Sequence, residues 1–533
     1  MHAMSFVFIG IKIPHRCFVD EFDGNGTVSY DHQAVWNSSI PFDSNGEISQ
    51  CKRFSPGSNK SEIESCNKWV FDTSKYSSSV RIDYSLVCDR SILAAVAQSV
   101  YMAGMLIGAV LLGELSDKFG RRKLLLISIV LQLISGIGLA FAPEYFSFIF
   151  FRFLLGNAHS GVFLPGFTLG MEFVGPKGQV GAGMEFVGPK GQVGAGISPH
   201  MYFGMGFCVI SLLAYFIKSW KWLQLAITLP ALLFASYYWL IPESARWLLR
   251  KNRKEEAKVV LRNAAKINRV TIPDIILETT EKEVEGPKEN FIHIFRYKFM
   301  RRNALIVFYD WFVVSLVFYG LSFGSASLPG GLYFNVALSG LVELPGAIYC
   351  WVFMDRLGRR FTLSCAMLIT GCCCIGTIFI GSNTEYWWIS AILSNIGKAF
   401  VSAGFILVYQ YSAELFPTLV RNSAVGFSSM CARIGGVITP FINFMGYLHP
   451  AVPAGTFGGL ALIAGLLTII LPETLNRPLP ESLDEGEQLN RVWKMYKPVP
   501  TSEQEADDNN DDDELYKRKM ASLNNDTNST STI

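Results

Sequence analysis

Long apolar stretches separated by short polar connectors dominate the pattern of this chain. A helix needs roughly 20 mainly apolar residues to cross the hydrocarbon core of a bilayer. A membrane strand would instead show strict alternation, which these stretches lack. The pattern therefore predicts an all-α polytopic membrane protein. Its eleven apolar runs lie at 92–113, 124–142, 145–170, 201–217, 221–241, 303–325, 332–353, 362–381, 386–412, 424–447 and 454–471.

The composition supports this interpretation. Of the 533 residues, 50% are hydrophobic and only 17% are charged, whereas soluble domains are about a quarter charged. The net charge of +2 gives no reason to expect a nucleic-acid partner. The sequence has no ATP-binding Gly-x-x-x-x-Gly-Lys-Ser/Thr loop, no nucleophile elbow and no metal-ligand cluster. We therefore expect neither an ATP-driven pump nor an intramembrane enzyme, and neither a cofactor nor a metal.

The placement of lysine and arginine predicts the orientation in the membrane. Basic clusters at 120–123 and 358–360 and a basic stretch at 246–302 follow apolar runs. The positive-inside rule makes them cytoplasmic, which puts segment 15–91 outside the cell and the protein in the plasma membrane. That segment carries four cysteines and three glycosylation sequons, as an extracellular loop would. These residues are Cys17, Cys51, Cys66 and Cys88, and Asn25, Asn37 and Asn59. Three disulfide pairings are open, and free thiols with unused sequons are the alternative.

The runs fall into two groups around a long polar connector. Five runs precede it and six follow it. Residues 1–14 are apolar but too short to span, and we interpret them as the remnant of a first span, which makes the plan six plus six. The predicted parts are this remnant, an extracellular loop at 15–91, bundles at 92–241 and 303–472, a cytoplasmic loop at 242–302 and a disordered cytoplasmic tail at 473–533.

Two short motifs recur in both halves. The segment 116–122 (SDKFGRR) matches 354–360 (MDRLGRR), and Pro242-Glu243-Ser244 matches Pro472-Glu473-Thr474. Weak internal symmetry of this kind is typical of transporters built from two repeated bundles. A different repeat, with identical copies at 170–182 and 183–195, lengthens one connector, which a flexible loop tolerates.

The motifs, taken in order, resemble those of a known family. Gly113-x-x-x-Asp117-x-x-Gly120-Arg121-Arg122-Lys123 resembles the loop signature of the major facilitator superfamily. The large cysteine-rich first outer loop is similar to that of the organic cation/carnitine/organic anion transporter family. So are the segments 242–248 (PESARWL), 310–312 (DWF), 319–321 (YGL), 342–345 (VELP) and 414–422 (ELFPTLVRN). The resemblance implies a major facilitator fold of two six-helix bundles that moves small organic ions by alternating access.

Charged residues beside the repeated motifs are candidates for a conformational lock. Arginines at helix ends hydrogen-bond exposed carbonyls, and carboxylates pair with them across a bundle. Such contacts would hold the two halves together in one state and release them in the other; anchoring of the orientation is the alternative. Gln179 and Gln192 stand where the family usually has arginine, which removes an expected partner in the first half. The candidates are Asp117, Arg121, Arg122, Glu243, Arg246, Asp355, Arg359, Arg360, Glu414 and Arg421.

Ionisable residues inside the apolar runs indicate a substrate path, because burying a charge costs several kcal/mol unless it is paired or hydrated. Internal pairing, for instance of Glu343 with Arg433, is the alternative. Aromatic rings attract organic cations by roughly 0.5–2 kcal/mol, so nearby rings are candidate lining residues, with ordinary packing as their alternative. The ionisable residues are Asp310, Glu343, Lys398 and Arg433. The predicted substrate-binding residues are Trp311, Phe318, Tyr319, Glu343, Arg433 and Lys398.

The resemblance also bears on the charge of the substrate. Glu343 and Trp311 fall where cation-binding relatives have a carboxylate and an indole. Cation transporters of the family commonly have aspartate where this chain has Arg433, and carnitine-type and anion-transporting members have arginine. Anion transporters commonly have lysine where this chain has Ala347. We therefore predict a secondary transporter of small organic cations or carnitine-like zwitterions, driven by the membrane potential or by a coupling ion (sodium or a counter-substrate). An organic anion transporter and a transport-inactive sensor on the same fold are the alternatives.

Overall fold

The computed structural model describes most of the chain. The described residues are 1–23, 30–31, 39–42, 48–55, 62–173, 192–268, 291–328, 330–380, 386–449, 451–477 and 479–492. The predicted glycosylation sites Asn25, Asn37 and Asn59 and most of the tandem repeat lie outside them. The chain divides into two units, Met1–Glu487 and Gln488–Ile533, and the fold below is that of the first.

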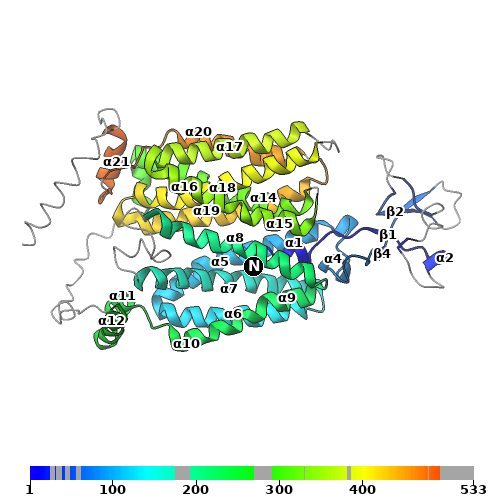
Figure 1. Ribbon diagram of the computed structural model, residues 1–533, viewed down its shortest axis with the longest axis horizontal. Helices are drawn as coiled ribbons and strands as arrows, with labels where there is room; N and C mark the ends of the chain where they lie inside the picture. The colour runs from blue at the N-terminus through cyan, green and yellow to red at the C-terminus, as the bar shows by residue number, and fades with distance from the viewer. Residues whose placement is uncertain are drawn as a thin grey trace, which may run out of the picture. The chain divides into compact units, whose positions relative to one another are not determined.

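Long helices form two bundles (Figure 1). The N-terminal bundle contains α5 (Ile92–Phe119), α6 (Arg121–Ala140), α7 (Tyr145–Phe173), α8 (Gln192–Phe216) and the continuous segment α9 (Trp220–Thr228), η2 (Leu229–Ser236) and α10 (Tyr237–Leu240). The C-terminal bundle contains α14 (Lys298–Gly324), η4 (Ser325–Ser327), α15 (Leu332–Leu341), α16 (Glu343–Leu357), α17 (Arg359–Ile380), α18 (Trp387–Leu415), α19 (Thr418–Met445) and α20 (Ala451–Thr468).

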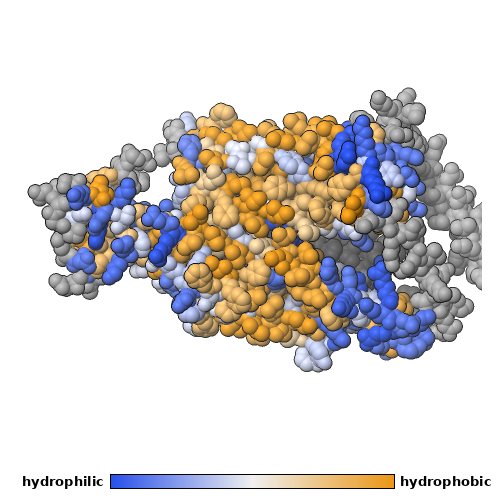
Figure 2. Space-filling model, turned by 180° about the vertical axis from the view of Figure 1, so that it is seen from behind, coloured by the Kyte–Doolittle hydropathy of each residue, from blue (hydrophilic) through white to orange (hydrophobic). Residues whose placement is uncertain are grey.

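The helices confirm the all-α polytopic prediction. Within the part of the chain that the structure describes, 10 helices are long and apolar enough to cross a membrane, and Tyr202–Phe216 forms a shorter apolar helix. Each coincides with a predicted run. Large apolar side chains cover the outside of the bundles, and polar side chains gather at their two ends (Figure 2). This distribution suits a surface that faces lipid along its middle and water at its ends.

Each bundle has its own apolar core. One core gathers buried residues of α14 to α20, and a second gathers residues of α5 to α9 with the N-terminal segment and with Val336 of α15. Close helix packing depends on small residues. At Gly156 of α7, for instance, an added Cβ would collide with the carbonyl oxygen of Tyr101 on α5. The two bundles therefore have largely separate cores, which meet at α15.

Residues 1–14 pack against the N-terminal bundle. They include the short helix α1 (Ser5–Ile9), and Phe8 and Ile9 are buried in the N-terminal core. Gln98 of α5 donates a hydrogen bond to the carbonyl of Ala3 (3.3 Å). Ser79 and Arg81 hold the following turn through the carbonyls of residues 9 to 11.

The predicted outer loop contains short strands and helices held together by disulfides. Strand β1 (His15–Cys17) pairs antiparallel with β4 (Trp69–Phe71), and β2 (Lys52–Phe54) pairs antiparallel with β3 (Ile63–Ser65). Short helices α2 (Asp20–Asp23), α4 (Val80–Asp83) and η1 (Cys88–Arg90) complete it. The structure joins Cys17 to Cys66 and Cys51 to Cys88, one of the three pairings that the sequence left open. Two-stranded sheets are marginal alone, so these crosslinks stabilise the loop by restricting its unfolded chain.

We call the end of the bundles that carries this loop the loop end, and the opposite end, where the repeated charged motifs lie, the motif end. The connector at the motif end forms α11 (Ala245–Arg250), α12 (Lys254–Asn268) and η3 (Phe291–Arg296). The tail was predicted to be disordered from residue 473, but its first part is ordered and contains α21 (Leu483–Val492). Leu483 is buried, and Glu487 accepts hydrogen bonds from the backbone N–H groups of Phe299 and Met300 (both 2.9 Å). A carboxylate at this helix N-terminus satisfies donors that would otherwise have no partner.

Candidate substrate path

The two bundles touch through two sets of helices. In one contact α5 meets α19, and in the other α8 meets α15 and α16. Ser99 of α5 donates a hydrogen bond to the carbonyl of Val437 on α19 (2.8 Å). On the other side, a Cβ added at Gly204 of α8 would lie 2.7 Å from the carbonyl oxygen of Gly340 on α15. These contacts lie in the halves of the helices nearer the loop end.

The motif-end halves of the same helices have room around them. Gly113 of α5 is about four turns beyond Ser99 and therefore on nearly the same helix face. A Cβ at Gly113, or at Gly426 of α19, would meet no atom within 4 Å among the described residues. The surface is also hollowed between the bundles at this end in Figure 2. In this state the bundles are therefore closed at the loop end and separated at the motif end.

A buried ion pair lies near the middle of the path. Lys398 of α18 is 2% exposed, and its ammonium is 3.3 Å from a carboxylate oxygen of Glu343 on α16, whose side chain is 1% exposed. The ammonium also lies 3.2 Å from the centre of the Phe318 ring and 5.4 Å from that of Phe207, and it donates to the hydroxyl of Ser322. A cation held by a carboxylate and two aromatic rings is the arrangement that an organic cation would need.

A break in one helix positions the carboxylate. Helix α15 ends at Leu341 and α16 begins at Glu343. Pro345 has no N–H to donate to the carbonyl of residue 341, so the regular hydrogen-bond ladder is interrupted here. Proline is tolerated in the first turn of the new helix, and a carboxylate at its N-terminus favours the positive end of the helix dipole. The local sequence thus places Glu343 at a helix end inside the bundle.

Internal pairing of the buried charges was the alternative interpretation, and the structure has such a pair, but Glu343 pairs with Lys398 and not with Arg433 of α19, which was given as the example. The guanidinium of Arg433 instead donates to the carbonyl oxygen (2.9 Å) and the hydroxyl of Ser429, one turn earlier. Its Nε is buried and has no hydrogen-bond partner among the described residues. Tyr319 of α14 lies close enough to interact electrostatically with both Arg433 and Glu343.

The three predicted aromatic residues have different places. Phe318 lies against the ammonium of Lys398, and Tyr319 stacks on Phe323 (5.8 Å between ring centres). Trp311 was predicted to line the path, but its indole is buried in the C-terminal core. It donates to the hydroxyl of Ser412 (2.8 Å) and packs edge-on against Tyr409. Trp311 therefore joins α14 to α18.

Other buried groups divide between the path and the bundle interiors. Asp310 accepts a hydrogen bond from the hydroxyl of Thr468 (3.0 Å) inside the C-terminal bundle. Arg152 of α7, which the sequence analysis missed although it lies within the 145–170 run, is fully buried. Its guanidinium lies 4.9 Å from the Tyr101 ring centre and donates to the side-chain oxygen of Gln98. Phe207 and Ser322 were also missed, since nothing in their local sequence distinguishes them from packing residues.

The repeated motifs fold into two equivalent caps. Glu243 accepts hydrogen bonds from the backbone N–H groups of Arg121 (3.0 Å) and Arg122 (3.1 Å) at the start of α6. In the second half, Glu473 accepts from those of Arg359 (2.8 Å) and Arg360 (3.2 Å) at the start of α17. The preceding residues, Gly120 and Gly358, have φ of 108° and 88°, which favour glycine. The sequence repeat is therefore also a structural repeat.

The side chains of the predicted lock stay within their own bundles in the contacts seen here. Arg121 pairs with Asp117 (3.3 Å). Arg359 pairs with Asp355 (3.3 Å) and with Glu414 (3.0 Å). Three other arginines donate to backbone carbonyls: Arg122 to that of Tyr238, Arg360 to that of Leu471 and Arg421 to that of Phe416. Arg246 lies in the first turn of α11. Each of these contacts lies within one half of the protein, and a lock that joins the halves in another state stays a prediction.

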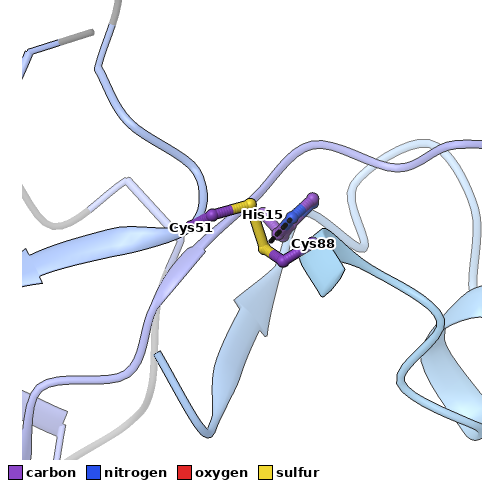
Figure 3. A group of neighbouring side chains, drawn as sticks. All are labelled: His15, Cys51 and Cys88. Atoms are coloured by element: carbon purple, nitrogen blue, oxygen red, sulfur yellow. Dashed lines mark hydrogen bonds between the residues drawn. A yellow bond between two sulfur atoms is a disulfide. The ribbon is translucent and has the colours of Figure 1, made fainter. Parts of the chain in front are cut away.

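One group of potential metal ligands lies in the loop (Figure 3). His15, Cys51 and Cys88 place their ligand atoms within 4.8 Å of one another. The two sulfurs form a disulfide, and only a thiolate is a good metal ligand. Nε2 of His15 contacts the Cys88 sulfur at 3.8 Å, and burial lowers the pKa of His15. We therefore interpret this group as packing around a crosslink.

Comparisons with known proteins agree with the fold. The sequence model of the Major Facilitator Superfamily matches residues 89–440 and 329–502. The chain is 38% identical to the "Organic cation transporter protein" of Drosophila melanogaster over 94% of this chain and 90% of the relative. It is 33% identical to the human "Solute carrier family 22 member 13" over 91% of this chain and 87% of the relative. It is 30% identical to the human "Organic cation/carnitine transporter 2" over 80% of this chain and 74% of the relative.

Solved structures share the fold. The E. coli xylose transporter XylE superposes with a TM-score of 0.56 at 16% identity, over 73% of this chain and 90% of that one. The identity is too low to carry more than the fold. With relatives above 30% identity along most of its length, the chain belongs to the organic cation/carnitine/organic anion transporter family of the major facilitator superfamily and is a secondary transporter, not an enzyme.

Proposed function

We propose that this protein carries small zwitterions of the carnitine type, and organic cations less well, across the plasma membrane by alternating access. The observation that carries the proposal is a pair of incompletely satisfied groups of opposite charge between the bundles. Among the described residues, the Glu343 carboxylate has the ammonium of Lys398, 3.3 Å away, as its one charged partner and accepts no hydrogen bond of good geometry, and Nε of Arg433 has no acceptor. A substrate ammonium near Glu343 and a substrate carboxylate on Arg433 would complete both.

The balance of buried charge supports a substrate that carries a carboxylate. Glu343 is already neutralised by Lys398, and Arg433, whose Nε has no acceptor among the described residues, adds a positive charge. A simple cation would have to displace the ammonium of Lys398 before it could bind to the Glu343 carboxylate and the Phe318 ring. A zwitterion gains the attraction of Arg433 as well, which offsets this competition.

The same balance supports a second candidate, an organic anion. If Lys398 stays on Glu343 throughout the cycle, only the positive groups remain for the substrate. A substrate carboxylate bound to Arg433 would then be enough for binding, and the substrate would need no ammonium near Glu343. This candidate differs from the first in one respect, namely whether Glu343 contacts the substrate.

Uptake by cells that express the full chain separates the candidates. We would compare labelled carnitine, tetraethylammonium and an aromatic carboxylate in wild type, Glu343→Gln and Arg433→Gln, with Lys254→Gln on the exposed helix α12 as the matched charge-removal control. The zwitterion proposal expects both site variants to lose carnitine uptake by at least about tenfold, the effect of roughly 1.4 kcal/mol. Carboxylate uptake that needs Arg433 but not Glu343 supports the anion transporter. Tetraethylammonium uptake that is insensitive to Arg433→Gln, with no carnitine uptake, would refute both.

Alternating access requires the closed end of the protein to open and the open end to close. The loop-end contacts, such as that of Ser99 with Val437, would separate, and the motif ends would approach. We propose that the lock residues, among them Asp117 and Arg421, then join the halves. Unchanged surface expression and unchanged uptake of an Asp117→Ala variant would contradict the lock.

We propose that the loop end is extracellular and the motif end cytoplasmic. The two loop disulfides suit an oxidising compartment, and the basic motifs suit the cytoplasmic side. An impermeant glycosidase should shift the electrophoretic mobility of the protein on intact cells. Repeating uptake in depolarised and in sodium-free cells tests the driving force, since each charge moved is worth about 2.3 kcal/mol per 100 mV.

A further inference from the structure

A second cavity lies at the loop end, apart from the central path. It has a volume of about 830 Å³ and is lined by both bundles. Its walls come from the N-terminal segment, the first turns of α5, the end of α14 with η4, the start of α18 and the junction of α19 with α20. Glu343, Lys398 and Arg433 are not among its lining residues. We call this cavity the vestibule.

The charge of the vestibule is one-sided. Lys12 and Arg81 line it, and its described lining includes no carboxylate. The acidic residues nearest in sequence do not change this balance. Asp83 is bound by Lys221 (3.1 Å) and by the indole N–H of Trp220 (3.0 Å), and the exposed Asp89 lies beside Arg90 outside the lining.

Both cations have capacity for a ligand. The ammonium of Lys12 is exposed and lies 5.0 Å from the centre of the Tyr447 ring, which is also part of the wall. Arg81 uses Nε to donate to the carbonyl of Gly10 (2.8 Å). Among the described residues, its two terminal nitrogens make no side-chain hydrogen bond or ion pair. A guanidinium fork held in place by its Nε is suited to a carboxylate.

The remaining walls indicate which anion fits. Phe323, Phe444 and Phe457 provide apolar surface, and Ser327 adds an exposed hydroxyl at the rim. At the inner side lies Gln98, whose side-chain oxygen accepts from the buried Arg152. Arg152 therefore adds a buried positive charge behind this wall. Apolar walls with a basic mouth suit an organic carboxylate better than a small inorganic anion.

We propose that the vestibule is an outer binding site that captures the carboxylate of an organic anion or zwitterion on Arg81 and Lys12 before the central path opens to it. The field of two cations in a low-dielectric cleft raises the local concentration of anions and repels cations. The link to transport rests on the proposed function, whereas the capture of a carboxylate in the vestibule does not.

The electrostatic part is testable without transport. A Ser327→Cys variant of the full chain places a thiol at the rim, and its rates of reaction with an anionic and a cationic methanethiosulfonate reagent of similar size are compared. We expect the anionic reagent to be favoured, and Lys12→Gln and Arg81→Gln each to lower the rate ratio about fivefold at low salt. Arg81→Lys, which keeps the charge, should largely keep the ratio.

Three controls define the result. The chain without Ser327→Cys measures background thiols, and a Ser77→Cys variant places a thiol on the loop, outside the lining. Arg90→Gln removes an exposed loop-end charge that does not line the cavity, so it should leave the ratio at Ser327→Cys unchanged. A ratio near one, or a ratio that Lys12→Gln and Arg81→Gln do not change, would overturn the vestibule proposal.

Uptake then tests the link to transport. Lys12→Gln and Arg81→Gln should raise the KM for carnitine or an aromatic carboxylate about three- to tenfold with little change in maximal rate, and should not raise the KM for tetraethylammonium. Equal changes for carboxylates and cations would refute capture. If the rate ratio is one but Arg433→Gln still abolishes carboxylate uptake, the vestibule fails and the proposed function stands. If the ratio is as expected but no carboxylate is taken up, the proposed function fails instead.

Discussion

Removing one partner of the buried Lys398–Glu343 pair should destabilise the protein more than removing both. The charges lie 3.3 Å apart, and the two side chains are 2% and 1% exposed. At an effective dielectric constant of about 20, their attraction is about 5 kcal/mol. Lys398→Met leaves a carboxylate buried with no other donor, since neither oxygen of Glu343 accepts a hydrogen bond from the described residues. We expect a cost of about 3–5 kcal/mol for this variant and for Glu343→Gln.

The double variant, Lys398→Met with Glu343→Gln, removes both charges and keeps the volumes similar. Replacing a buried pair by uncharged groups is often nearly neutral, so we expect this variant to be more stable than either single variant. Thermal unfolding of the purified full chain in detergent measures the effect. Lys254→Met on the exposed start of α12 serves as the control and should leave the midpoint unchanged. Single changes that are both small and additive in the double variant would show that the two charges are not coupled in the folded protein.

Three further outcomes are expected. Glu473→Ala removes the acceptor for the N–H groups that begin α17 and should cost about 1–2 kcal/mol, seen as a lower unfolding midpoint; a midpoint equal to wild type would contradict the cap. A Cys51→Ser, Cys88→Ser double variant opens a loop of 37 residues and should destabilise the loop by up to about 4 kcal/mol, measured by protease sensitivity at the cell surface; resistance equal to wild type would contradict this. Burial lowers the pKa of His15 from its usual 6.5. Its contribution to stability is therefore complete above about pH 6.5 and lost as the pH falls through the lowered native value. Protection factors for hydrogen exchange in the loop, which correct for the intrinsic pH dependence of exchange, should therefore fall as the pH drops below about 6.5, and fall less in His15→Gln; an identical fall in both would refute the assignment.

The helical spans were predictable because the signal is local. Crossing a bilayer requires a continuous apolar run of a certain length, and such a run can be recognised in the sequence without knowing what packs against it. The paired motifs at 116–122 and 354–360 could also be recognised in the sequence, because a repeated supersecondary unit repeats its sequence. The family followed from the order of these motifs. The break in the helix before Glu343 is also encoded locally, by Pro345.

The partners of the buried charges were not predictable. Glu343 meets Lys398 rather than Arg433 because the rotation and tilt of α16, α18 and α19 decide which faces meet, and no local pattern specifies rotation. The same reason explains Trp311, whose indole faces α18 inside its bundle although its sequence motif suggested the path.

The disulfide pairing and the vestibule also depend on contacts distant in sequence. Four cysteines on one side of a membrane permit three pairings with nearly equal local chemistry, and the packing of β1 and β4 brings Cys17 near Cys66. The vestibule combines Lys12, Arg81 and the far ends of the C-terminal helices, which no stretch of sequence contains together. A sequence specifies which helices form and where charge is costly, and only the packing of the helices determines which charges share a cavity.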